Sequence, residues 1–255
     1  MLSNQELERY SRQMLIEEIG YEGQKKLKDG RVLVIGAGGL GSPALLYLAA
    51  AGVGTIGIAD FDCVDLSNLQ RQILHTTDRI GVPKTESAEK TLRALNPEVR
   101  FIRIPTRITP ENITGLIRDY DIVLDCTDGM ENKLMINDAC VKSEKPFVHA
   151  GVLGTSGQIM TWIPGGNYPC FRCIAGNEPA DDSCESCAVM GVLGAATGTA
   201  GSLQAAEAIK YLTGAGDLLT GRILFFDLLR QDFTVLDIPE RSPDCSACGK
   251  QERTA

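Results

Sequence analysis

The sequence RVLVIGAGGLGSPALLYLAAAGVGTIGIAD, which fills residues 31–60, decides the fold. It opens with an apolar, β-branched run, continues with a segment rich in alanine and leucine, and closes with a second apolar run. Such runs are typical of strands buried on both faces of a parallel sheet, and the segment between them is typical of a crossover helix. Residues 31–60 are therefore predicted to form a β-α-β unit.

The same alternation continues to about residue 150. A helical segment at residues 83–97 precedes apolar runs at residues 99–104 and 121–126. A second helical segment, at residues 130–143, precedes a run at residues 146–151. Alternating strands and helices predict a Rossmann-like, doubly wound, mostly parallel α/β sheet.

The pattern changes after this point. Three further apolar runs predict antiparallel strands, with a long cysteine-rich loop between the first run and the other two; they lie at residues 157–164, 222–229 and 233–239. Residues 191–212 predict a helix of small residues, whose glycines would let another backbone approach closely. We expect the antiparallel strands to continue the parallel sheet, so that residues 1–255 form one domain.

Composition excludes some classes of function. The 255 residues are 44% hydrophobic, which is enough for a sizeable core, and they carry 33 acidic against 25 basic side chains. This balance argues against a broad surface for nucleic acid or for an anionic membrane. No window approaches the roughly 18 apolar residues that cross a bilayer. We predict a soluble, cytoplasmic protein without nucleic-acid or membrane partners.

A glycine motif between the first two predicted strands indicates a nucleotide site. Gly36, Gly38 and Gly41 form G-x-G-x-x-G at the start of a predicted helix, where backbone N–H groups and the helix dipole can hold phosphate. Asp60 ends the next strand, where a carboxylate can accept hydrogen bonds from a ribose. The glycines could also serve only a tight turn. Alone, these features favour an NAD-dependent oxidoreductase.

Charged residues further along the chain favour ATP instead. Asp62, Arg71 and Lys84 follow the glycine motif, and the two cations could stabilise the charge of a departing pyrophosphate. Either cation alone is more often a solvated surface residue. Asp128 follows a predicted strand at the edge where such sheets bind ligands, so it could hold Mg²⁺ on the phosphates. Asp125, close by, is interpreted as a turn or capping residue without a catalytic role.

The nine cysteines include three C-x-x-C pairs, at Cys170/Cys173, Cys184/Cys187 and Cys245/Cys248. An odd number spread over a long chain is a poor disulfide framework. Two C-x-x-C knuckles can instead supply the four thiolates of a closed, tetrahedral Zn²⁺ site that ties distant segments together.

Taken together, these motifs resemble the ThiF/MoeB/HesA family, the bacterial relatives of ubiquitin-activating enzymes. The resemblance covers residues 5–249 and rests on six stretches besides the cysteine pairs: RYSRQ at 9–13, the glycine loop at 36–54, DFD at 60–62, SNLQRQ at 67–72, PK at 83–84 and DCTD at 125–128. It implies ATP-dependent adenylylation of the C-terminal glycine of a small ubiquitin-like sulfur carrier, ThiS- or MoaD-like, with release of pyrophosphate. Residues 1–150 would then be the nucleotide-binding part, and residues 151–255 the crossover loop, antiparallel strands and zinc knuckles.

The resemblance also assigns roles by position. It places Gly39, Asp60 and Asp62 at the nucleotide, Asn68, Arg71 and Lys84 at the polyphosphate, and Asp128 at Mg²⁺; Gly129 departs from the asparagine usual in the family. Arg12 matches an arginine that reaches into a neighbouring subunit's site, which implies a homodimer. Zn²⁺ is assigned to the outer cysteine pairs, Cys170, Cys173, Cys245 and Cys248. Cys187 matches a cysteine used by some members for covalent sulfur chemistry, although its acidic loop makes an unreactive thiol the better interpretation.

The chemistry needs no side-chain base. The carrier's terminal carboxylate is ionised at neutral pH and is itself the nucleophile, so His75 and His149 are predicted to be structural. The expected partners are a carrier ending in Gly-Gly, a second subunit, and a separate sulfur donor or sulfurtransferase, because no sulfurtransferase domain follows the last cysteine pair. Two alternatives remain: an NAD-dependent oxidoreductase and a zinc-stabilised nucleotide-binding module without catalysis. The carrier could serve thiamin, molybdopterin or another pathway.

Overall fold

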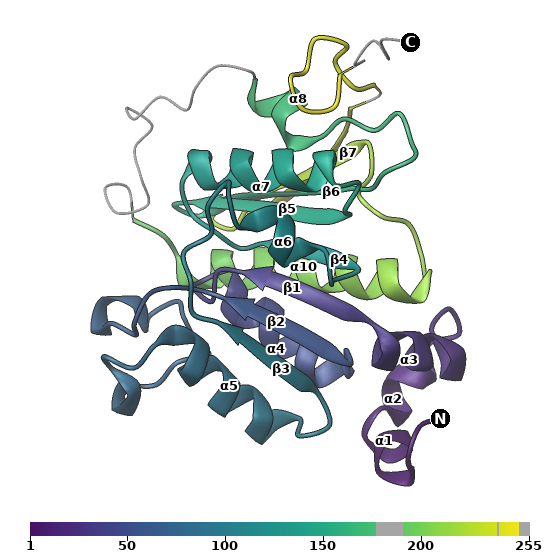
Figure 1. The fold of residues 1–255 in the computed structure, drawn as a ribbon, viewed down its shortest axis with the longest axis vertical. Helices are drawn as coiled ribbons and strands as arrows, with labels where there is room; N and C mark the ends of the chain where they lie inside the picture. The colour runs from purple at the N-terminus through teal and green to yellow at the C-terminus, as the bar shows by residue number, and fades with distance from the viewer. Residues whose placement is uncertain (177–190, 239, 250–255) are drawn as a thin grey trace.

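The computed structural model describes residues 1–176, 191–238 and 240–249. Its centre is one eight-stranded sheet in the order β3-β2-β1-β4-β5-β6-β7-β8 (Figure 1). The first five strands are parallel, and β5 to β8 pair antiparallel. The strands are β1 (Arg31–Ile35), β2 (Thr55–Ala59), β3 (Arg100–Ile104), β4 (Ile122–Asp125), β5 (Phe147–Leu153), β6 (Ser156–Trp162), β7 (Arg222–Asp227) and β8 (Asp232–Asp237). The predicted fold, a parallel sheet continued by antiparallel strands, is confirmed.

Helices cover both faces of this sheet. One face carries α3 (Gly20–Asp29), α4 (Gly41–Ala51), α5 (Lys84–Leu95) and α10 (Gly194–Thr213), and the other carries α6 (Ile113–Ile117), α7 (Met130–Lys142) and α8 (Phe171–Ala175). The other helices of the described residues are α1 (Asn4–Arg9), α2 (Ser11–Met14) and the short 3-10 helices η1 (Leu66–Asn68) and η2 (Thr77–Arg79). No helix among the described residues is long and apolar enough to span a membrane.

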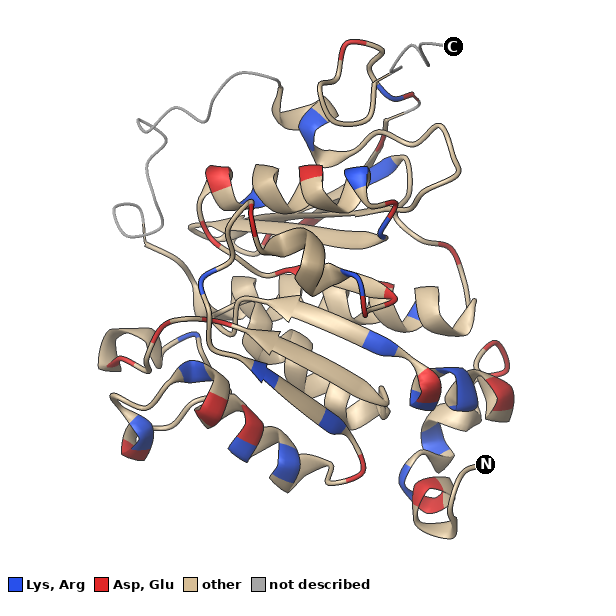
Figure 2. Ribbon diagram, in the orientation of Figure 1, with Lys and Arg blue, Asp and Glu red and all other residues tan. Residues whose placement is uncertain are grey.

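The strands divide the interior into two cores. In β1, Val32 and Val34 pack toward α4 and α10, whereas Leu33 and Ile35 pack toward α6 and α7. Because both faces are covered, alternate residues are equally apolar, as the sequence of the strand predicted. Figure 2 shows the consequence for charge: α4 and α10 are almost free of charged residues, whereas the more exposed α5 carries both signs.

The helix of small residues packs as its glycines predicted. A Cβ atom at Gly201 would lie 2.2 Å from the carbonyl oxygen of Leu40, so only glycine lets α10 come so close to the start of α4. The helix begins at Gly194 rather than at residue 191, since Gly191 has a φ of +74° that no right-handed helix accepts. The short helix α6 was not predicted, because five residues are too few to show a periodic pattern.

Candidate functional site

The glycine loop occupies the carboxyl end of β1, beside the carboxyl end of β4. Gly36 has a φ of +98°, and a Cβ atom there would lie 2.5 Å from the carbonyl oxygen of Cys126. A Cβ atom at Gly41 would lie 1.9 Å from the carbonyl oxygen of Gly36. Both positions therefore exclude a side chain. They hold the start of α4 at the sheet edge, where its N–H groups can face a phosphate.

Asp60 holds the loop from the end of β2. Its Oδ2 accepts a hydrogen bond from the backbone N–H of Ala37 at 2.8 Å, and its Oδ1 accepts one from Asp62 at 2.8 Å. Each carboxylate oxygen can accept a further bond, so a ribose can still bind there. Asp60 thus fixes the conformation of the glycine loop, and it is also predicted to bind the ribose beside that loop.

Lys84 is buried beside the loop rather than solvated. An isolated β-bridge between Cys63 and Pro83 places the segment that carries Asp62 beside the start of α5, and Lys84 Nζ pairs with Asp62 Oδ2 at 3.0 Å. The Lys84 side chain is 6% exposed, against 50% for Asp62. A half-exposed carboxylate therefore fixes an almost buried ammonium group at the first residue of α5.

The segment after η1 brings further polar groups to this edge. Gln72 is buried, and its Nε2 donates to Asn68 Oδ1 at 2.6 Å. The amide nitrogen of Asn68 then points to Ser67 Oγ at 3.1 Å and remains a donor. Arg71 is half-buried, and its Nη1 donates to the carbonyl oxygen of Ser67 at 3.3 Å.

The start of α10 closes one side of the loop. A Cβ atom at Gly39 would lie 3.1 Å from Thr197, and one at Gly194 would lie 2.5 Å from the carbonyl oxygen of Gln70. The helix that returns after the cysteine-rich segment therefore lies against both the glycine loop and the segment that carries Arg71. The glycine loop, the segment that carries Arg71 and the start of α10 are far apart in the sequence but lie side by side at the predicted nucleotide site.

Asp128 is exposed just beyond β4, as predicted. Its carbonyl oxygen accepts a hydrogen bond from Asn132 Nδ2 at 3.0 Å. Gly129, where the family usually has asparagine, precedes α7 with a φ of +77° and a ψ of 133°, a conformation that favours glycine. A carboxylate is a donor that suits Mg²⁺, so Asp128 fits the proposed metal.

Sequence reasoning missed a buried polar network at the end of β4. Asp125 Oδ2 lies 3.3 Å from Lys133 Nζ and 3.1 Å from His149 Nδ1, and all three residues are buried. Burial raises the pKa of Asp125, but Lys133 and the hydrogen bonds from His149 and Thr127 outweigh it, so the net pKa lies well below its ordinary value. Burial lowers the pKa of His149 to about 4. At neutral pH an ionised Asp125 therefore lies beside a neutral imidazole of His149.

The sequence did carry a signal for this network. Lys133 lies three residues before Ile136 and seven before Cys140, and both of these are fully buried. A lysine at such a spacing lies on the core-facing side of α7 and requires a buried partner. The other histidine, His75, is also buried, with its ring bonded to the carbonyl oxygen of Ala37 and to Ser87 Oγ at 2.9 Å each. Both histidines are buried and hydrogen-bonded within the protein, and their structural role remains a prediction.

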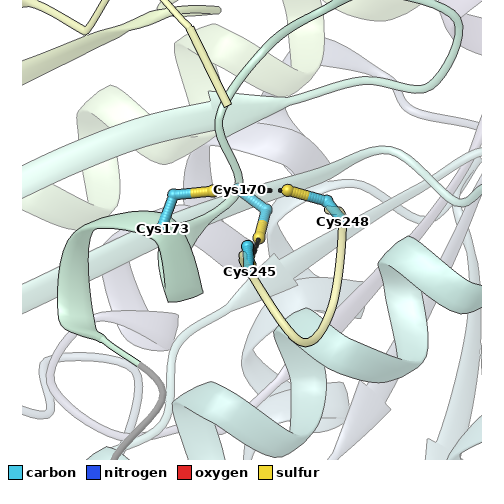
Figure 3. A group of neighbouring side chains, drawn as sticks. All are labelled: Cys170, Cys173, Cys245 and Cys248. Carbon is cyan, nitrogen blue, oxygen red and sulfur yellow. Dashed lines mark hydrogen bonds between the residues drawn. The ribbon is translucent and has the colours of Figure 1, made fainter. Parts of the chain in front are cut away.

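The side chains of the outer cysteine pairs point toward one another, as Figure 3 shows. Cys170 and Cys245 have sulfur atoms 3.7 Å apart, those of Cys173 and Cys248 are 3.3 Å apart, and all four lie within 4.8 Å of one another. Four Zn–S bonds of about 2.3 Å in a tetrahedron place sulfur atoms roughly 3.8 Å apart, so the cluster suits Zn²⁺. The predicted association of these four cysteines is confirmed.

α7 anchors this cluster. Asn137 Oδ1 accepts a hydrogen bond from the backbone N–H of Phe171 at 2.9 Å, and Arg172 forms two bonds to Asp138 at 2.8 and 2.7 Å. Both contacts hold α8, which carries Cys173 and follows Cys170. The knuckle is therefore attached to the helix that begins beside Asp128.

We expect Cys173→Ser to lower zinc content and melting temperature together. A structural Zn²⁺ site contributes several kcal/mol to folding, and each kcal/mol shifts the melting temperature of a chain this size by about 2–4 °C. A fall of about 10 °C or more should follow. Zinc is measured by mass spectrometry and melting by calorimetry, with Cys63→Ser, an exposed cysteine outside the cluster, as the control. Full zinc in Cys173→Ser would contradict the assignment.

Arg12, a predicted site residue, lies away from the carboxyl end of the sheet where the glycine loop is. Cys187 lies outside the described residues. Arg12 is exposed on α2, and its neighbour Gln13 donates to the carbonyl oxygen of Ala51 at 3.2 Å. Ala51 ends α4, whereas the glycine loop precedes that helix, so Arg12 is about one helix length, roughly 16 Å, from its own loop.

Comparison with known proteins identifies the family. The ThiF family matches residues 10–247. The chain is 44% identical over 250 residues to "Adenylyltransferase and sulfurtransferase MOCS3" of Drosophila virilis, covering 98% of this chain and 55% of that protein. It is 43% identical over 253 residues to "Sulfur carrier protein adenylyltransferase" of Thermus thermophilus, covering 98% of this chain and 93% of the relative. It thus spans about half the length of the MOCS3 relatives that it matches.

The fold has solved counterparts. The structure of E. coli MccB with ATP superposes with a TM-score of 0.83 at 26% identity, covering 95% of this chain and 75% of the other. The family match covers most of the chain, two relatives are more than 40% identical, and the fold is shared. These findings agree with the motifs around the glycine loop and with the cysteine cluster. The chain belongs to the ThiF family.

Proposed function

We propose that this protein uses ATP to adenylylate the C-terminal glycine carboxylate of a small ubiquitin-like sulfur carrier, with release of pyrophosphate. Two relatives named as adenylyltransferases support this activity, and one of them is named for a sulfur carrier. The observation that carries the proposal is the cationic side of the site. Lys84 is fixed almost buried against Asp62, and Arg71 lies on the segment that packs on α10. A dinucleotide would not require these cations.

Positioning and charge account for the proposed chemistry. The glycine loop and Asp60 hold the nucleoside and its phosphates, while Asn68, Arg71 and Lys84 stabilise the charge that moves onto pyrophosphate. When bound, Mg²⁺ supplies further positive charge on the phosphates, and Asp128 is the residue that would hold it. The carrier's ionised carboxylate attacks the α-phosphorus, so the buried and neutral His149 has no proton to remove.

The proposed partners follow from the same reaction. A carrier tail ending in Gly-Gly would reach the α-phosphate, and a separate sulfur donor would convert the adenylate to a thiocarboxylate. A second subunit would supply Arg12, which is too far from its own glycine loop to act there. Any role of Cys187 would lie in the sulfur step, because attack by a carboxylate on ATP requires no thiol.

A nucleotide comparison tests the proposal. We expect Mg²⁺ and ATP, but not NAD, to bind in calorimetric titrations, since the cations beside the loop match a triphosphate. Addition of a carrier ending in Gly-Gly should start exchange between pyrophosphate and ATP, and mass spectrometry should detect the carrier adenylate. A carrier that lacks its last glycine is the control. Tight NAD binding without ATP binding would favour the oxidoreductase, and ATP binding without exchange would favour a noncatalytic module.

A further inference from the structure

The turn between β4 and α7 carries Asp128, the residue proposed to hold Mg²⁺, and its first half is fixed from within the protein. Asp125 Oδ1 accepts hydrogen bonds from the backbone N–H of Thr127 at 3.1 Å and from its hydroxyl at 2.7 Å. The second half of the turn is fixed by the hydrogen bond that Asn132 Nδ2 donates to the carbonyl oxygen of Asp128. The exposed carboxylate of Asp128 therefore projects from a turn held on both sides.

The two oxygen atoms of Asp125 have different partners. Oδ2 faces Lys133 and His149, and these contacts balance the charge of a carboxylate that is 1% exposed. Oδ1 faces only the turn in the hydrogen bonds described. The bonds to Thr127 thus satisfy the second oxygen of a buried carboxylate and, at the same time, tie the turn to it.

The surroundings keep this carboxylate in one place. Lys133 Nζ also donates to the carbonyl oxygen of Ala150 at 2.6 Å, and the ring of His149 stacks on Phe171 with a centroid distance of 3.7 Å. Gln204 of α10 donates to the carbonyl oxygen of Asp125 at 2.7 Å. Contacts from α7, β5 and α10 thus fix both the backbone and the side chain of Asp125.

We propose that Asp125 is a positioning residue: through Thr127 it presets the turn that presents Asp128 to Mg²⁺-ATP. This inference rests on the proposed function, because it takes Asp128 as the metal-binding residue. A preset turn lowers the conformational entropy that metal binding must remove, so the contribution of Asp125 lies in metal-dependent nucleotide binding. It does not touch the nucleotide itself.

Thr127 allows a test that leaves the buried ion pair intact. The measured quantity is the ratio of ATP affinity with Mg²⁺ to ATP affinity in EDTA, obtained by calorimetry without any carrier. Thr127→Val removes the hydroxyl bond to Asp125 and should lower this ratio by about fivefold to tenfold, since bonds to charged groups are among the stronger ones. ATP affinity in EDTA should stay within about twofold. Thr127→Ser keeps the hydroxyl and should match the wild type.

A double-mutant cycle separates the roles of Thr127 and Asp125. Asp125→Ala combined with Lys133→Met removes the ion pair as a unit, so no charge stays buried and unpaired. In that background Thr127→Val should cause no further loss, because its acceptor is already absent. If the Asp125→Ala/Lys133→Met protein does not fold, the affinity ratios of Thr127→Val and Thr127→Ser still test whether the hydroxyl bond to Asp125 matters.

Three outcomes would overturn the inference: an unchanged ratio in Thr127→Val, a full additional loss in the Asp125→Ala/Lys133→Met background, or a wild-type protein whose ATP binding Mg²⁺ does not strengthen. None of these depends on the carrier. Pyrophosphate exchange, measured separately with a carrier, reports on the proposed function. Failure of the inference and failure of that function are therefore distinguishable.

Discussion

Lys84→Met should lower pyrophosphate exchange by about 10²-fold or more, and Arg71→Ala should have an effect of similar size. Each variant removes a fixed positive charge from the place where charge develops on the departing pyrophosphate, and loss of one such group typically costs about 10²–10³ in rate. Because Lys84 is nearly buried and held by Asp62, its charge needs little reorganisation during the reaction. Methionine keeps the apolar stem that packs in this space.

The fold should tolerate both changes. In Lys84→Met the half-exposed carboxylate of Asp62 regains water, so melting temperature should change little. Lys90→Ala, which removes an exposed lysine from the same helix, is the matched control and should leave exchange unaltered. Exchange is measured with saturating carrier and ATP. A wild-type exchange rate in either variant, after mass spectrometry has confirmed the substitution, would show that the replaced cation does not stabilise the polyphosphate.

The fold was predictable because its strands are locally distinct. In β1 every residue of the run from Val32 to Ile35 is buried, so a continuous apolar sequence was sufficient to indicate a strand covered on both faces. The antiparallel continuation was predicted from apolar runs as well, although β7 is only partly buried and every residue of β8 is exposed. The contact of Gly201 with the start of α4 was also predictable, since a glycine inside a helical segment usually marks a close approach of another backbone.

The surroundings of the site residues were less predictable. Lys84 was predicted to bind phosphate, but its burial accompanies the pairing of the segments at Cys63 and Pro83, which no local pattern reveals. Asp125 was interpreted as a turn residue, which its bonds to Thr127 bear out, yet its pairing with Lys133 arises only when α7 packs on the sheet. Sequence patterns report which residue types are present, whereas burial and pairing depend on contacts between distant elements.

The zinc cluster was predictable in its ligands but not in the contacts that hold them. The C-x-x-C spacing predicted ligands, because two cysteines three residues apart can bind one ion. The spacing could not show that Asn137 and Asp138 of α7 hold the Cys170 knuckle. The structure adds a path of contacts along α7 from that knuckle to the turn that carries Asp128.

Mixed dimers of Arg12→Ala and Asp128→Ala should regain activity that each variant lacks alone. Arg12 is exposed about one helix length from its own glycine loop, so a role in catalysis requires the site of a second subunit. In a two-fold dimer, one site of the mixed species then contains both intact residues, and the other site contains neither. The isolated mixed dimers should therefore recover about half of wild-type exchange, and an unfractionated mixture, in which random exchange makes half of the dimers mixed, about a quarter.

The measurement needs proof that subunits have exchanged. Differently tagged variants are mixed, the doubly tagged species is isolated, and its pyrophosphate exchange is compared with that of each parent. Mixing Asp128→Ala with an Asp128→Ala partner that carries the other tag is the control, since its dimers have no intact site. If Arg12 acted within its own chain, every subunit of the mixed dimer would carry one defect and activity would stay at the parental level. Recovery near half in the isolated mixed dimers therefore requires Arg12 and Asp128 to meet across the subunit interface, and its absence in confirmed mixed dimers would place Arg12 outside the neighbouring site.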